Sequence, residues 1–202
     1  PVFSQLLMAD EINRASPRTQ SALLQAMQER RVSVAGHPHD LPKPFHVLAT
    51  QNPLEQEGTY PLPEAQLDRF LLEINVDYPD IDAERQMLIA TTGARETQVS
   101  AVMSPDDLMT AQGLVRRVPV GESVVEAILS LVRRGRPESS DLPEVPQQVA
   151  WGPGPRASQA LMLAVRARAL MGGRFAPSLD DVLAMAAPIL RHRISLTFPA
   201  RA

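Results

Sequence analysis

The sequence contains no cysteine, no excess of positive charge and no apolar run of membrane-spanning length, and each absence excludes a class of protein. Without cysteine there is no disulfide and no thiolate chemistry, which is compatible with a reducing compartment. Twenty Lys and Arg against 23 Asp and Glu give a net charge of −3, so no general basic field attracts nucleic acid or an anionic membrane. Because a signal peptide is also lacking, we expect a cytoplasmic protein that neither inserts into a membrane nor binds nucleic acid.

The apolar content, by contrast, is high enough for a substantial core. Apolar residues make up 44% of the 202 positions, which allows one large domain or two small ones. The chain starts with proline rather than methionine. We therefore expect it to be part of a longer protein whose first residues lie upstream.

The first part of the chain, residues 1–79, alternates between strand and helix patterns. Short apolar runs without clean alternation are typical of strands covered on both faces. Strands are predicted at 2–9, 45–50 and 71–76, helices at 17–30 and 64–69, and a hairpin at 32–42. Strands separated by helices in this way indicate a parallel sheet and an α/β fold.

The second part, residues 80–202, carries helical spacing almost throughout. Helices are predicted at 82–93, 105–117, 122–134, 155–171 and 179–192. The proline-rich stretch 133–148 reads as a long loop inside this part, and no strand is predicted anywhere in it. We therefore expect an all-helical domain.

Two adjacent charges, Asp10 and Glu11 in LLMADEINRA, directly follow the first predicted strand. Burying an unpaired carboxylate is costly, so such a pair usually faces a cleft, a metal or a partner. Gln51 and Asn52 end the second strand, and ligands of open parallel sheets bind outside these carboxyl ends. The alternative is that the pair merely begins a helix and complements its dipole.

The side chains at these strand ends are of types that can serve phosphate transfer. An aspartate such as Asp10 can hold Mg²⁺ through water molecules, since Mg²⁺ prefers oxygen ligands and keeps part of its hydration shell. The adjacent Glu11 could orient and deprotonate a water molecule. An amide such as that of Asn52 can hold the same water or the phosphate that it attacks.

Four ordered motifs carry a resemblance to a known family. They are LLMADEINRA at 6–15, VLATQNP at 47–53, EGTYPLPEAQLDRF at 57–70 and GPGPRASQAL at 152–161. In order and spacing they resemble the MoxR family of AAA+ ATPases through nearly the whole chain. The resemblance implies part of an AAA+ P-loop NTPase core with parallel strands at 1–79, followed by an all-helical lid domain at 80–202, and it implies ATP and Mg²⁺ as cofactors.

The resemblance also implies a role for five residues. Asp10 corresponds to the Walker B aspartate that binds the metal, and Glu11 to the glutamate that activates water. Asn52 falls on the sensor 1 position. Arg69 corresponds to the arginine finger that reaches the nucleotide of the neighbouring subunit, and Arg156 to sensor 2 near the γ-phosphate. An arginine suits both roles because it is always charged and binds phosphate through two hydrogen bonds.

Simpler interpretations remain open for the same residues. Arg69 could form a salt bridge with Asp68 or Glu64, and Arg156 could be a solvated residue in the first turn of a helix. The hairpin at 32–42 sits where this class of AAA+ proteins carries an insertion. It could contact neighbours or substrate, or it could be a plain surface hairpin.

One departure from the family is the lack of a G-x-x-x-x-G-K-[ST] stretch, the loop that cradles the phosphates. We expect this P-loop to lie upstream of residue 1 and the isolated chain to be inactive. The parent would be a chaperone-like remodelling or activating ATPase with a protein client, a hexameric ring and a von Willebrand factor A domain partner. Two alternatives are a non-catalytic interaction module of such a ring and a related AAA+ machine, such as a magnesium chelatase subunit or a DNA-directed motor.

Overall fold

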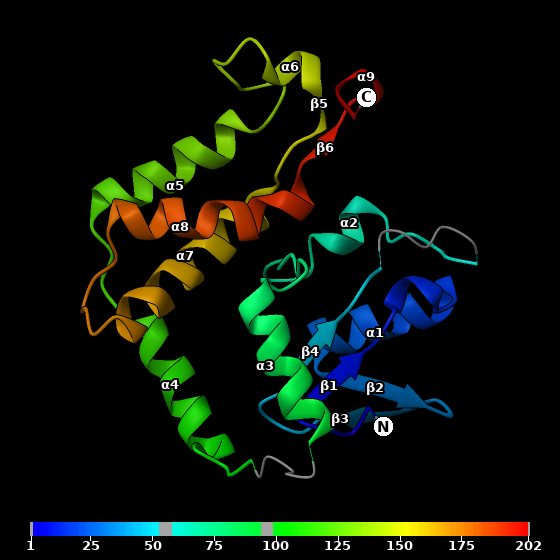
Figure 1. Cartoon of the computed structure of the whole chain (residues 1–202). Coiled ribbons are helices and arrows are strands. Elements are labelled where there is room, and N and C mark those ends of the chain that lie inside the picture. The colour runs from blue at the N-terminus through cyan, green and yellow to red at the C-terminus, as the bar shows by residue number, and fades with distance from the viewer. Residues whose placement is uncertain (1, 53–57, 94–98, 202) are drawn as a thin grey trace.

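The computed structural model describes residues 2–52, 58–93 and 99–201 (Figure 1). A small α/β part lies at the N-terminal end and a larger group of helices follows it in the chain. No helix in the described residues has the length and apolar content needed to cross a membrane.

A parallel pair of strands forms the centre of the α/β part, as the sequence predicts. Strand β1 (Leu6–Ala9) pairs with β4 (His46–Ala49) in the register Leu6 to His46 through Ala9 to Ala49. Helix α1 (Pro17–Glu29) covers one face of the pair, where Leu24 is almost completely buried.

The opposite face of this pair is open, so the prediction that both faces are covered is wrong. Leu6, Met8 and Leu48 are 62, 60 and 53% exposed. The side chains alternate along each strand, and only those that point to α1 are shielded. An apolar run therefore shows that both faces are apolar, but it does not show which of them is covered.

Local signals set the boundaries of α1 and of the hairpin that follows it. The Ser16 hydroxyl accepts a hydrogen bond from the Thr19 N–H, and Pro17 occupies the first helical position. Strands β2 (Arg31–Val34) and β3 (His37–Asp40) then pair antiparallel. Ala35 and Gly36 between them both have positive φ, as a tight two-residue hairpin turn requires.

The third predicted strand, at 71–76, is not a strand. After helix α2 (Glu64–Leu67) the chain runs without a sheet partner, and Leu72 packs against the core of the helical part. The Glu73 N–H donates to the Pro188 carbonyl at 2.8 Å. The apolar residues of this segment therefore dock it onto the helices, which its sequence pattern alone does not distinguish from pairing in a sheet.

The helical part is built around three long helices that share one core. Residues that are fully or almost fully buried there include Ile128, Val132, Leu161, Val165 and Ile189. The helices after residue 80 are α3 (Ile81–Thr92), α4 (Pro105–Arg117), α5 (Glu122–Arg134), α6 (Val145–Gln148), α7 (Pro155–Met171), α8 (Leu179–Leu190), the 3₁₀ turn η2 (Arg191–Arg193) and α9 (Phe198–Arg201). Helices α5, α7 and α8 supply the core, and α4 packs against α7.

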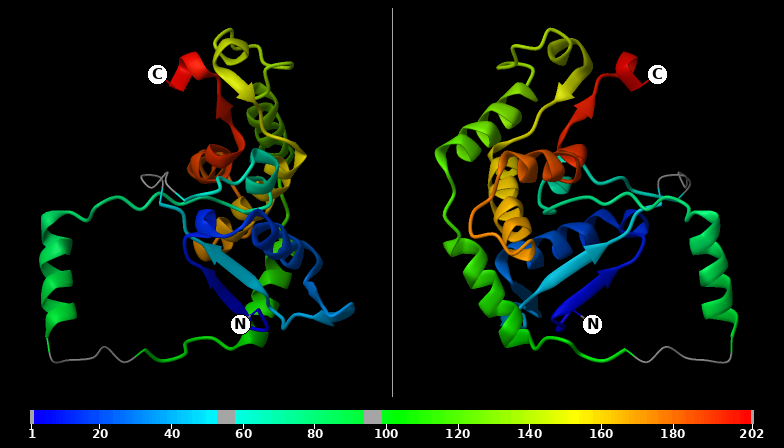
Figure 2. Two further views of the ribbon diagram at one scale, coloured as in Figure 1. Left: turned by 90° about the vertical axis from the view of Figure 1, so that its right-hand side faces the viewer. Right: turned by 60° about the vertical axis from the view of Figure 1, so that its left-hand side comes forward.

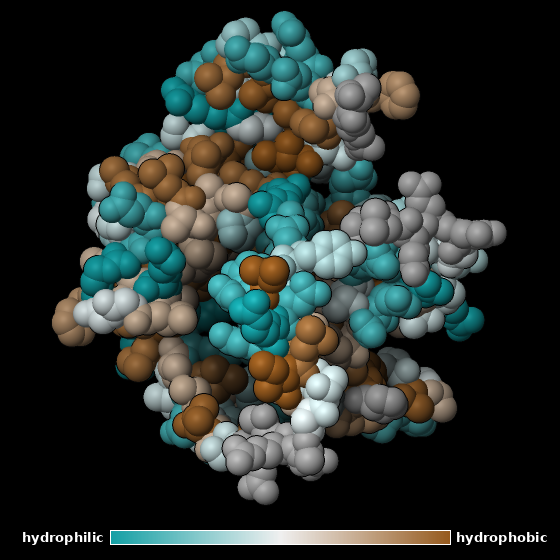
Figure 3. Space-filling view, in the orientation of Figure 1, coloured by the Kyte–Doolittle hydropathy of each residue, from teal (hydrophilic) through white to brown (hydrophobic). Residues whose placement is uncertain are grey.

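Helix α3 is separate from this core. Figure 2 shows it standing apart from the remaining helices, and none of its residues is buried. The surface over α3 that faces the viewer in Figure 3 carries both apolar and polar side chains. Ile81 and Ile89 are 73 and 70% exposed. The five long helices are found where the sequence predicts them, but α3 contributes nothing to the helical core.

The expectation of an all-helical second part is wrong in one detail. Strand β5 (Val149–Trp151) pairs antiparallel with β6 (Ser195–Leu196), and the Thr197 N–H donates to the Gln148 carbonyl at 2.7 Å. Three residues and two residues are too few to produce a periodic pattern, so only the pairing itself reveals these strands.

A buried carboxylate holds the turn between α7 and α8. Asp181 is 2% exposed. Its carboxylate accepts a hydrogen bond from each terminal nitrogen of Arg174 at 2.6 Å and one from the Ser178 N–H at 2.8 Å. The hydrogen bonds from Arg174 hold the pKa of Asp181 well below its usual range. Asp181 is thus an ionised, buried carboxylate whose charge is paired with Arg174.

Candidate functional site

Polar side chains meet where β1 and β4 end. Because the strands are parallel and in register, the residues after Ala9 and Ala49 become neighbours, and the Thr50 N–H donates to the Ala9 carbonyl at 3.1 Å. The Thr50 hydroxyl donates to Asp10 Oδ1 at 2.5 Å and accepts from the Glu11 N–H at 2.8 Å. A single hydroxyl therefore links the two acidic residues to the end of the second strand.

Glu11 adopts an unusual backbone conformation at this edge. Its φ of 49° and ψ of 53° lie in the left-handed region, which residues other than glycine rarely occupy. The bond to Thr50 and the Ile12 N–H, which donates to the Thr50 carbonyl at 3.0 Å, hold it there. Arg30 at the end of α1 and Ala35 in the hairpin turn have similar φ values, and residues in this region also occur at functional sites.

The side chains of Asp10 and Glu11 are accessible to a ligand. Asp10 is exposed, and its Oδ1 oxygen accepts the hydrogen bond from Thr50. The Glu11 carboxylate lies 2.9 Å from Arg14 Nε, and both side chains are about half exposed. An ion pair in that environment is weak and readily exchanged.

The donor set fits a hydrated magnesium ion and not a dedicated metal cage. Within residues 2–52, 58–93 and 99–201, no group of three or more His, Asp or Glu side chains could hold a metal. Mg²⁺ commonly needs only one or two carboxylates because water and substrate phosphates complete its coordination. Asp10 meets that requirement, and Asn52, half-buried two residues beyond Thr50, follows on the same edge.

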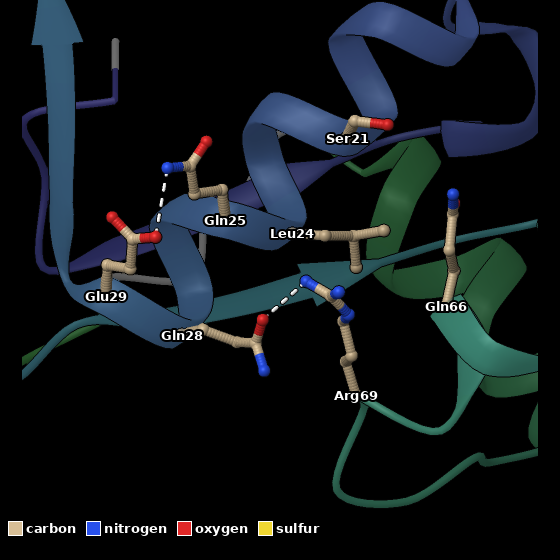
Figure 4. A pocket seen from close by; sticks show the side chains of 7 residues that line it. All are labelled: Ser21, Leu24, Gln25, Gln28, Glu29, Gln66 and Arg69. Carbon is tan, nitrogen blue, oxygen red and sulfur yellow. Dashed lines mark hydrogen bonds between the residues drawn. The ribbon is translucent and has the colours of Figure 1, made fainter.

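Arg69 lies in a different place, beside α1. Its Nη1 donates to Gln28 Oε1 at 2.5 Å (Figure 4). The two residues line an open pocket of about 310 Å³ between α1 and α2. An adjoining pocket of about 190 Å³ is lined by Arg69 together with Phe45 and His46, where β4 begins.

The structure therefore separates Arg69 from Asp10 and Glu11 within one chain. Arg69 lies by the start of β4, whereas the acidic pair follows the end of β1. Four strand residues span about 13 Å, too far for a direct contact. Among the described residues, no hydrogen bond or ion pair joins Arg69 or Arg156 to the acidic pair.

A buried arginine holds the backbone around Arg69. Arg193 is 3% exposed, and all five of its N–H groups are used. They donate to Asp68 Oδ1 (2.8 Å) and to the carbonyls of Asp68 (3.2 Å), Phe70 (2.5 Å), Leu71 (3.2 Å) and Ile189 (2.5 Å). Because Asp68 pairs with Arg193, the alternative that it pairs with Arg69 is wrong. Burial lowers the pKa of Arg193, which the carboxylate of Asp68 partly offsets.

His192, next to Arg193, is also buried. Its Nε2 lies 3.3 Å from the Phe70 carbonyl oxygen, so Nε2 carries the proton of a neutral imidazole. Burial, together with the charge of Arg193, lowers the pKa of His192 to about 4. The side chain is therefore neutral at physiological pH.

Arg156 lies in the first turn of α7, exposed to solvent, after Gly154 at the N-cap. It is close enough to Arg193 for its charge to lower the pKa of that guanidinium. Its position in a first helical turn is the one expected from the sequence.

Three residues that organise the site are not evident in the sequence: Thr50, Gln28 and Arg193. Thr50 could have been selected because it is a polar residue at the end of a predicted strand. Gln28 and Arg193 give no such signal, because each acts on a segment that is distant in sequence, 41 residues away for Gln28 and as far as 125 for Arg193.

Two models of known families match parts of this chain. A model of the ATPase family associated with various cellular activities (AAA) matches residues 1–72. A model of the AAA lid domain matches residues 144–202, which we call the lid. Asp10, Glu11, Asn52 and Arg69 fall within the first match, and Arg156 and Arg193 within the second.

Similar proteins are found in several bacteria. Chaperone MoxR1 of Mycobacterium tuberculosis is 44% identical over 100% of this chain and 54% of its own length. Protein YeaC of Bacillus subtilis is 42% identical over 97% of the chain and 59% of its length, and protein MoxR of Paracoccus denitrificans is 32% identical over 93% and 59%. The chain thus spans little more than half the length of these relatives.

A solved structure shares the fold. The crystal structure of a protein from Cytophaga hutchinsonii superposes with a TM-score of 0.94 at 37% identity. The match covers 100% of this chain and 62% of that one. The arrangement of the α/β part and the helices is therefore that of a known protein architecture.

Proposed function

The chain belongs to the MoxR family of AAA+ ATPases, with the α/β core and lid of that fold, and from this we propose that it carries the hydrolytic part of an ATP site. The observation that supports this most directly is the linkage of Asp10 and Glu11 through the Thr50 hydroxyl at the ends of two parallel strands. The strained backbone of Glu11 adds to it.

We propose that each side chain at this edge has one task. Bound Mg²⁺ would supply positive charge to the phosphates, and Asp10 would hold it through water. The Glu11 carboxylate would leave Arg14, accept a proton from the attacking water and so allow its oxygen to bond to the γ-phosphorus as the bond to ADP breaks. Asn52 would orient the same water.

We further propose that Arg69 serves the site of a neighbouring subunit. Its distance from the acidic pair of its own chain and its exposure to solvent support an action in trans. A ring is implied, hexameric by family resemblance, in which Arg156 at the start of α7 contacts the γ-phosphate. An always-charged guanidinium is suited to both tasks.

The phosphate-binding loop has to come from outside the 202 residues, because the sequence contains no G-x-x-x-x-G-K-[ST] stretch. The family resemblance implies a longer cytoplasmic protein that remodels or activates a protein client, with a von Willebrand factor A domain partner and a domain boundary near residues 79 and 80. Each of these is part of the proposal. We expect the 202 residues alone to be inactive.

The central test compares turnover with nucleotide binding in a longer polypeptide that includes a P-loop. Glu11→Gln should bind ATP with nearly unchanged affinity, while hydrolysis falls to the background, because the variant loses only the proton acceptor. Glu126→Gln, an exposed change on α5, is the matched control and should be fully active. Turnover by Glu11→Gln at the wild-type rate would refute the assignment of the base.

Mixing of subunits tests Arg69. Arg69→Ala alone should lower turnover about 1,000-fold or more, as expected for an arginine finger. Its own acidic pair remains intact, so neighbours that carry Glu11→Gln and a normal Arg69 should restore part of the activity. If no mixture is more active than its components, the action in trans is wrong.

The lack of a P-loop in the sequence favours one rival, a non-catalytic interaction module of an AAA+ ring. Equilibrium binding of ATP to the 202-residue chain, with and without Mg²⁺, separates the two. Tight Mg²⁺-dependent binding would exclude a purely structural role. Absence of binding to the chain, with activity in the longer polypeptide, would agree with the proposal.

A further inference from the structure

The turn that carries Arg69 is held by the lid. Arg193, at the end of the 3₁₀ turn after α8, donates to the carbonyls of Asp68, Phe70 and Leu71 as well as to the Asp68 carboxylate. These groups lie immediately before and after Arg69 in the chain. The direction in which the Arg69 side chain leaves the backbone therefore depends on a residue more than 120 positions away.

Further contacts attach residues 64–73, the segment that contains Arg69, to the lid. Leu72 packs against the helical core, and the Glu73 N–H donates to the Pro188 carbonyl at 2.8 Å. The Ser195 hydroxyl donates to Glu64 Oε1 at 3.0 Å, at the other end of the segment. Contacts with the lid thus run from the start of α2 to the residues after Arg69.

The α/β part holds the segment in a different way. Leu67 and Phe70 pack against the cluster that contains Leu24, and the Arg69 side chain donates a hydrogen bond to Gln28 of α1. Apolar packing tolerates small sliding, and a single bond between exposed side chains exchanges easily with water. The charge-assisted bonds to the backbone carbonyls of Asp68, Phe70 and Leu71 come from Arg193 of the lid.

We propose that Arg193 is a positioning residue for Arg69, which couples the orientation of this arginine to the position of the lid. When the lid shifts relative to α1, Arg193 turns the backbone of residues 68–71. Arg69 then releases Gln28 and reaches the nucleotide site of the neighbouring subunit. The inference rests on the proposed role of Arg69 in hydrolysis, but the coupling itself is a property of this chain and is measurable without nucleotide.

The coupling is tested first in the 202-residue chain, whose lack of cysteine allows clean labelling. Spin labels at Ala65→Cys on α2 and Leu183→Cys on α8, both exposed, report the distance between the segment and the lid. Arg193→Lys keeps the charge but loses the five-donor fork, so the distance distribution should broaden. Arg191→Lys, exposed in the same turn, should leave it unchanged. An unchanged distribution in Arg193→Lys would overturn the coupling.

The link to hydrolysis is tested in the longer polypeptide with a P-loop. Arg193→Lys should lower kcat about 10- to 100-fold, a fraction of the effect of an arginine finger, while the Kd for ATP stays unchanged. In the Arg69→Ala background, Arg193→Lys should lower turnover no further, because it acts through Arg69. A loss that multiplies the effect of Arg69→Ala, or a raised Kd, would show that Arg193 is merely structural.

Two outcomes keep this test separate from the proposed function. If Arg69→Ala leaves turnover unchanged, the proposed role of Arg69 fails, while the spin-label distances still decide whether Arg193 couples the segment to the lid. If Arg193→Lys does not fold, Asp68→Asn replaces it in both measurements. This variant removes only the charge of the carboxylate that accepts the hydrogen bond from Arg193 Nε. A normal distribution and normal kcat in a folded Asp68→Asn variant would then overturn the inference.

Discussion

The helical part and the α/β part use their apolar residues differently. In the described residues, eleven buried side chains of the helical part form one cluster across α5, α7 and α8, whereas the α/β part buries two clusters of three. One face of the β1–β4 pair is open, and its leucines and methionine are exposed. Within the described residues, the helices therefore carry most of the buried apolar core and the strands carry less of it.

Charged residues follow the same division. Asp181 and Arg193 are 2 and 3% exposed and satisfy their bonds within the helical part or at its junction with the segment after α2. Asp10 and Arg69, which we propose to act in hydrolysis, are exposed and make hydrogen bonds to Thr50 and Gln28. Asp181 and Arg193 therefore support structure, whereas Asp10 and Arg69 are accessible to ligands and neighbours.

The largest expected effect comes from comparing leucines in the two parts. Leu161→Ala, at a fully buried position on α7, should lower the free energy of unfolding by about 3 kcal/mol because it leaves a cavity in the core. Leu6→Ala, at an exposed position on β1, should change it by less than about 0.5 kcal/mol. Urea unfolding of both variants measures the difference.

An equal loss of unfolding free energy in Leu161→Ala and Leu6→Ala would contradict this difference between the helical part and the α/β part. It would show that the outward face of β1 is covered in solution by an association of the chain with itself. Unfolding at two protein concentrations checks this, because the stability of an associated form depends on concentration.

A smaller effect should appear at His192, which lies at the junction of the two parts. Burial lowers its folded-state pKa to about 4, below the ordinary 6.5, so between these values the unfolded chain binds more protons. Stability should therefore fall as the pH drops from 6.5 toward 4, by about 1 kcal/mol at pH 5 once solvent screening is allowed for. Urea unfolding at pH 7.5 and 5 measures this change.

His192→Gln should abolish this part of the pH dependence, because Gln does not titrate. His37→Gln, an exposed change in the β2–β3 hairpin, should retain it. A pH dependence that is the same in all three proteins would mean that another group is responsible.

Local signals predicted the parts of the fold that depend on neighbours in sequence. Ser16 and Pro17 start α1 where expected, since capping is settled within one turn. The acidic pair lies at a strand end beside Thr50, because two apolar runs separated by a helix pair in parallel. The fold class and the long helices followed from the same reasoning and from the family resemblance.

The parts that were missed depend on partners distant in sequence. Residues 71–76 look like a strand, but Leu72 finds its partners in the helical core and not in a sheet. The pairing of β5 with β6 joins segments more than 40 residues apart. Arg193 and Asp68 likewise meet only after the lid has docked. The proposed targets of Arg69 and Arg156 belong to a nucleotide or another subunit, which no pattern inside the chain can locate.

The smallest expected effect concerns the strain at Glu11. At this position glycine should be more stabilising than alanine, the reverse of the usual order. With φ at 49°, a β-carbon is unfavourable at this position and glycine is not. Glu11→Gly should therefore be more stable than Glu11→Ala by about 0.5 to 1 kcal/mol, although glycine normally destabilises. Both variants lose the ion pair with Arg14, so the comparison isolates the backbone. A more stable alanine variant would show that Glu11 relaxes out of this conformation in solution, which would remove the strain as support for its proposed role.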